Sequence, residues 1–80
     1  MNIYLISQEI NNDYDTYDSA VVTAKTAAKA KQIHPGGKRE INEWDRYGSW
    51  AYEPAQVKAK LIGVSKQTKE GIILASFNAG

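Results

Sequence analysis

Short apolar stretches with the period of a strand or a helix alternate along this chain with polar segments. In residues 2–8, Ile3 and Leu5 point one way and Tyr4 and Ile6 the other, so both faces are apolar. This pattern predicts a strand that lies inside a sheet. Residues 19–24, SAVVTA, form a second β-branched run after a polar connection over residues 9–18. They predict a second strand, antiparallel to the first.

A helix is predicted from Ala27 to about Ile33. The hydroxyl of Thr26 can cap its first turn, and Ala27, Ala30 and Ile33 then align on one face. Pro35 disfavours a helical conformation of His34, and two glycines follow at 36–37, so the helix should end there.

Residues 57–64 alternate between apolar and lysine positions, which predicts a strand with one solvated face. Residues 71–77, GIILASF, are apolar on both faces and predict a buried strand. The polar segment 65–70 predicts an antiparallel hairpin between the two. The fold class is therefore α+β in the order β-β-α-β-β, a mostly antiparallel four-stranded sheet with one helix on one face. The predicted core is formed by Ile3, Leu5, Val22, Ala30, Ile33, Leu61, Ile72, Leu74 and Phe77.

Length and composition restrict the possible functions. The 80 residues form a single domain, 1–80, which buries roughly 60 % of the surface of its unfolded chain. The absence of cysteine excludes disulfides and thiolate metal sites. A net charge of +1 argues against nucleic acid as a partner. The N-terminus carries neither a signal peptide nor a membrane span, so the expected location is the cytoplasm where the chain is made.

Catalytic and metal sites find little support in the sequence. Asp13, Asp15 and Asp18 alternate like calcium ligands, but no glycine and no final glutamate complete a calcium loop. His34 could pair with Asp45 or Glu43 as a general base, yet no sequence motif identifies a serine or threonine as its nucleophile. A histidine that meets the last carbonyls of the helix is the simpler interpretation. We therefore expect no catalytic residue, no metal and no cofactor.

Residues 34–52 have neither helix nor strand periodicity, yet they contain the only histidine and both tryptophans. Around Gly36 and Gly37, backbone amides could face an anion beside Lys38 and Arg39. The same Pro-Gly-Gly is also an ordinary helix stop, and the macrodipole there disfavours anions. At least one tryptophan is expected to cover the sheet, while aromatic rings beside arginine could stack a nucleobase or anchor a protein interface. The candidate ligand-binding residues are His34, Gly36, Gly37, Lys38, Arg39, Trp44, Arg46 and Trp50.

Several motifs spread over nearly the whole chain. They are YDTYDSAVV at 14–22, IHP at 33–35, WD at 44–45, a tryptophan at 50 before a proline at 54, VKAKLIG at 57–63 and GIILASFNAG at 71–80. Together they resemble a family of small proteins of bacteriophages and prophages that end in ILASFNAG. Relatives often have a longer loop after IHP than this chain has. The resemblance implies a phage protein acting in the cytoplasm of its bacterial host.

Small phage proteins without catalytic motifs often counteract host defences, and two routes remain open. One is sequestration of a nucleotide second messenger, such as a cyclic nucleotide or an ADP-ribose derivative. The other is direct contact with a host defence protein, such as a CRISPR effector. The residues of segment 34–52 favour the nucleotide route. A chain of this size would build such a pocket most easily between subunits, so we also expect a homo-oligomer.

Overall fold

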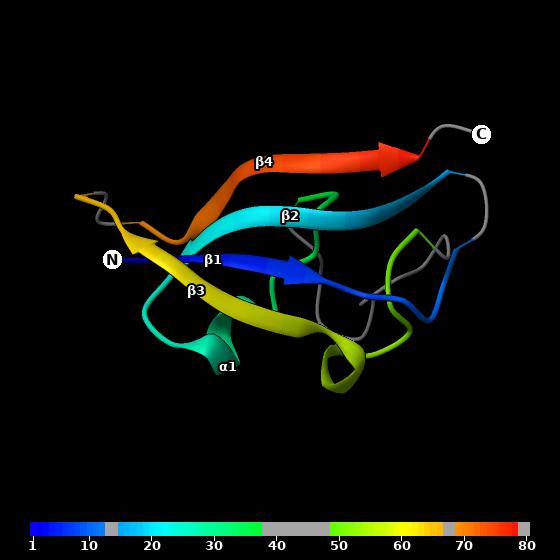
Figure 1. The fold of residues 1–80 in the computed structure, drawn as a ribbon, viewed down its shortest axis with the longest axis horizontal. Helices are drawn as coiled ribbons and strands as arrows, with labels where there is room; N and C mark the ends of the chain where they lie inside the picture. Colours follow the sequence, from blue (N-terminus) through cyan, green and yellow to red (C-terminus); the bar gives the residue numbers. More distant parts are fainter. Residues whose placement is uncertain (13–14, 38–48, 67–68, 79–80) are drawn as a thin grey trace.

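The structure is a computed structural model that describes residues 1–12, 15–37, 49–66 and 69–78. The α+β fold class and the element order are confirmed (Figure 1). The strands are β1 (Asn2–Ser7), β2 (Thr16–Ala24), β3 (Lys58–Val64) and β4 (Gly71–Asn78), with the helix α1 (Ala27–Ala30) after β2 and a 3-10 turn, η1 (Pro54–Gln56), before β3.

The helix is shorter than the sequence predicts. Its N-cap is Thr26, whose hydroxyl accepts a hydrogen bond from the Lys29 amide at 3.1 Å, as expected. Beyond Ala30, the amides of Gln32 and Ile33 donate to carbonyls three residues back, at 3.1 Å each. The last turn is therefore tightened, as is common at helix ends, and the helix stops before Ile33.

The four strands form one antiparallel sheet in the order β3-β1-β2-β4. The central position of β1 is confirmed. The predicted hairpin between β3 and β4 is wrong, because these strands lie at opposite edges (Figure 1).

The connection from β3 to β4 therefore runs from one edge of the sheet to the other, and its described residues are 65, 66, 69 and 70. The Ser65 amide donates to the Met1 carbonyl and the Met1 ammonium donates to the Ser65 carbonyl, both at 2.7 Å. The Thr23 hydroxyl donates to the Lys69 carbonyl at 3.0 Å. The connection is thus bonded to the start of β1 and the end of β2, and it brings β4 to the side of β2.

One face of the sheet carries the core. Its buried apolar residues are Tyr4, Ile6, Ala20, Val22, Ala24, Ala30, Trp50, Ala51 and Val57. The prediction is confirmed for Val22 and Ala30, and Ile33 and Ile72 pack against this cluster while partly buried.

For Ile3, Leu5, Leu61 and Leu74 the predicted burial is wrong. Tyr4 and Ile6 face the core in place of Ile3 and Leu5, a choice that a strand with two apolar faces does not reveal in advance. Leu61 lies on the edge strand β3, opposite Tyr4 of β1, and is 56 % exposed. Leu74 pairs with Val21 on the opposite face and is 67 % exposed. The side chain of Phe77 lies outside the described part of the chain.

Candidate ligand-binding site

A cavity of about 520 Å³ lies between the chain that follows α1 and the start of β4. This volume is within the usual range of small-molecule sites. Its lining residues are Gln32, Ile33, His34, Gly37, Glu70, Gly71 and Ile72. His34 and Gly37 belong to the candidate set from the sequence, so the structure places two of those residues at the cavity.

An ion pair connects the helix α1 to the residue before β4. The Lys29 ammonium of α1 lies 3.8 Å from a carboxylate oxygen of Glu70, which directly precedes β4. Both side chains are partly exposed, so this pair contributes little to stability. Its consequence is geometric, since it holds the Glu70 carboxylate near the end of the helix.

His34 is 2 % exposed and organises the turn after the helix. Its Nδ1 accepts a hydrogen bond from the Gly36 amide at 2.9 Å, and its carbonyl accepts one from the Gly37 amide at 2.9 Å. Because an amide can only donate, Nδ1 carries no proton, and a neutral imidazole then has its N–H on Nε2. That nitrogen lies 3.5 Å from the Ser49 hydroxyl. The ring also meets Tyr17 edge-on, with centroids 6.3 Å apart.

These bonds bear on the anion-binding nest predicted at Gly36 and Gly37. Both amides donate within the turn, so neither is an unengaged donor for a phosphate. Gly37 has a φ of 107°, a backbone conformation that residues with a side chain rarely adopt. The glycine is therefore explained by the turn, and Gly37 contributes the turn's backbone to the cavity wall.

Trp50 lies in the core. Its side chain is fully buried, which confirms that one tryptophan covers the sheet and corrects the prediction that Trp50 lines a binding surface. The segment around it is bonded to the sheet, since the Tyr17 amide donates to the Ser49 carbonyl at 2.7 Å. The Asn11 side-chain amide donates to the Trp50 carbonyl at 3.2 Å. A ring enclosed in this way cannot stack on a ligand without unpacking the core.

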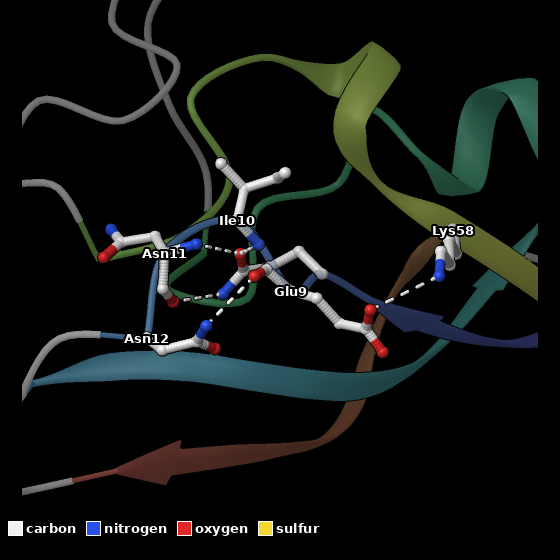
Figure 2. A network of polar contacts seen from close by, with 6 residues as sticks. Glu9, Ile10, Asn11, Asn12 and Lys58 are labelled. Atoms are coloured by element: carbon white, nitrogen blue, oxygen red, sulfur yellow. Dashed lines mark hydrogen bonds and ion pairs between the residues drawn. The ribbon is translucent and has the colours of Figure 1, made fainter.

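A polar network that no sequence motif predicts supports this arrangement. Buried Gln8 and Asn11 lie where β1 leads into residues 9–12, and an exposed ion pair joins Glu9 to Lys58 of β3 at 3.7 Å (Figure 2). Gln8 makes its hydrogen bonds to Ile10, Asn11 and Tyr17. The network fixes residues 8–11 beside Tyr17 of β2, and through Asn11 it fixes Trp50.

The chemistry of the cavity favours polar hydrogen-bonding groups over bare phosphate. Glu70 offers carboxylate acceptors, Gln32 offers an amide, and Ile33 and Ile72 supply apolar wall. Among the described lining residues there is no lysine or arginine. Hydroxyl and amino groups of a ligand would find acceptors here.

The four remaining candidates, Lys38, Arg39, Trp44 and Arg46, lie outside the described residues. The sequence does not mark Glu70 and Ile72 as site residues, because the pairing of β4 with β2 instead of β3 brings the start of β4 beside the helix end. No local sequence signal marks that contact.

The opposite face of the sheet carries a row of apolar side chains, of which Leu5 and Val21 are half-buried and Leu74 is exposed. Val21 pairs with Leu5 on one side and with Leu74 on the other. A shallow hollow of about 250 Å³ lies over this row and is bordered by Ser19 and Ser76. Apolar side chains in the middle of an exposed sheet face are typical of interaction surfaces.

Within the described ranges, no group of three histidine, cysteine or acidic residues could hold a metal ion. No helix in these ranges has the length and apolar character needed to cross a bilayer. The chain matches no known protein family, no curated protein and no solved structure.

Proposed function

We propose that this chain is a bacteriophage counter-defence protein that binds and sequesters a nucleotide second messenger of the host in the bacterial cytoplasm, without catalysis. The observation that carries the proposal is the cavity of about 520 Å³ beside His34 and Gly37. It has the size of a small-molecule site and lies where the sequence concentrates its candidate residues. The phage setting rests on the motifs that end in ILASFNAG.

In this proposal the cavity takes the nucleoside part of the ligand. The Glu70 carboxylate accepts hydrogen bonds from ribose hydroxyls, as acidic residues do in dinucleotide-binding folds. Gln32 bonds the edge of the base, and Ile33 and Ile72 contact its apolar surface. Lys38 and Arg39 follow Gly37 directly in the sequence and supply positive charge for the phosphates.

A thermal-shift screen of cyclic dinucleotides, cyclic trinucleotides and ADP-ribose derivatives tests the proposal. A ligand at a hundred times its dissociation constant stabilises the protein by about 2.7 kcal/mol. Glu70→Gln should weaken binding by roughly 10- to 100-fold, because a charge-assisted hydrogen bond contributes about 1.5–3 kcal/mol. Glu53→Gln is the matched control, an exposed acid outside the cavity. The bound ligand should be recovered chemically unchanged.

Inhibition of a host defence protein, such as a CRISPR effector, is the second candidate, and the apolar row of Leu5, Val21 and Leu74 favours it. The two candidates respond to different substitutions. If no nucleotide shifts the melting curve, and a host defence protein is captured by the wild-type chain and by Glu70→Gln but not by Leu5→Lys, the function is protein inhibition. Ala28→Lys, which adds the same charge on the exposed helix, controls for charge alone.

A further inference from the structure

The strand β4 has the composition of a buried strand but lies at an edge of the sheet (Figure 1). No residue from Gly71 to Asn78 is charged. Ile73 is 49 % exposed and Leu74 is 67 % exposed. In the single chain, therefore, an apolar strand borders solvent.

The other edge is built differently. Lys58 and Lys60 alternate along β3, and both are exposed. Lysines on an edge strand are a common protection against pairing with another sheet. Such protection is present on β3 and missing from β4, which distinguishes the two edges of one small sheet.

An edge strand also has unused backbone hydrogen bonds. Alternate residues of β4 direct their amide and carbonyl groups away from β2, and within the described part of the chain no strand pairs with that outer side. A second strand added there would satisfy these groups.

We infer that β4 is a self-association edge, which pairs antiparallel with β4 of a second copy of this chain around a two-fold axis. Two uncharged strands meet in this arrangement, so no like charges face each other. Pairing through β3 would bring the exposed Lys58 and Lys60 of both copies together at one shared edge. Pairing of β4 with β3 of another copy would leave an open chain of subunits, whereas the symmetric pair closes as a dimer.

The dimer joins both surfaces described above. The exposed side chain of Leu74 comes to lie beside the partner's strand, so the apolar row of Leu5, Val21 and Leu74 continues into the second copy. Glu70, Gly71 and Ile72 line the cavity at the start of β4, and an antiparallel partner places the far end of its strand beside them. The second copy thereby borders the candidate ligand site.

Two substitutions at matched positions test the inference. Ile73 and Ile62 are each skipped in the pairing register, on β4 and β3 respectively, and they are 49 % and 50 % exposed. Sedimentation equilibrium should show a dimer for the wild-type chain and for Ile62→Lys. Ile73→Lys should weaken dimerisation by on the order of 100-fold or more, because it places like charges across the two-fold axis.

A monomeric wild-type chain at its highest soluble concentration would overturn the inference, as would dimers that survive Ile73→Lys or dissociate with Ile62→Lys. Circular dichroism establishes that each variant is folded. Hydrogen exchange of the wild-type chain gives a measurement without substitution: β4 amides should exchange more slowly as the protein concentration rises, and β3 amides should not. All of these measurements are made without ligand, so their outcome is independent of the nucleotide proposal.

Discussion

Gln8 uses both ends of its side-chain amide to fix the residues that follow β1. Its Nε2 donates to the carbonyls of Asn11 and Tyr17, at 2.7 and 2.9 Å. Its Oε1 accepts from the amides of Ile10 and Asn11, at 2.9 and 2.7 Å. The residue is only 3 % exposed, so these backbone groups would find little water in its place. One side chain thus satisfies four backbone groups beyond the paired residues of β1.

Gln8→Ala should lower the free energy of unfolding by at least about 2 kcal/mol, since each buried polar group left unpaired costs about 1–3 kcal/mol. Urea denaturation followed by circular dichroism measures the loss. Asn12→Ala is the control, because Asn12 is exposed and its side chain donates a hydrogen bond of 3.0 Å to the Glu9 carbonyl. It should change stability by no more than about 0.5 kcal/mol. Equal effects of the two substitutions would show that the Gln8 bonds are not structural.

At the level of elements, the sequence predicts which segments are strands better than which faces they bury. Strand and helix signals are local, such as the alternation in residues 57–64 and the Thr26 cap, and they were confirmed. The buried face of β1 was predicted wrongly, because both of its faces are apolar. The skipped residues Ile62 and Ile73 also change the alternation within β3 and β4, and a bulge of this kind has no marker in one sequence.

The corrected faces change the expected cost of truncating apolar residues. Ile6 is fully buried, so Ile6→Ala should cost about 2–5 kcal/mol. Leu61 is 56 % exposed, and Leu61→Ala should cost less than about 1 kcal/mol because little apolar surface returns to water. Thermal unfolding of both variants at one protein concentration makes the comparison. A loss at Leu61 as large as that at Ile6 would place Leu61 in the core after all.

At the scale of the whole molecule, the strand order was the feature that the sequence could not predict. A short polar segment between two apolar runs indicates a hairpin, but here the two runs lie at opposite edges because each pairs with a strand from the N-terminal half. The candidate site shares this limit. His34 and Gly37 lie in segment 34–52, which the sequence marks as a candidate site. Glu70 and Ile72 line the cavity because β4 pairs with β2. Pairing over long sequence separations depends on the whole sheet, and local patterns do not encode it.

The connection from β3 to β4 can be tested by shortening it. Two strands separate β3 from β4, so their backbones lie about 14 Å apart at strand spacings of about 4.8 Å. An Asn-Gly turn in place of residues 65–70 spans about 11 Å at full extension, which cannot connect opposite edges. This variant should lose cooperative unfolding in a thermal melt, because β4 can no longer pair with β2. A six-residue Ser-Gly loop of the original length should keep cooperative unfolding, although it lowers stability. A hairpin variant as stable as the wild-type chain would place β3 and β4 side by side and refute this strand order.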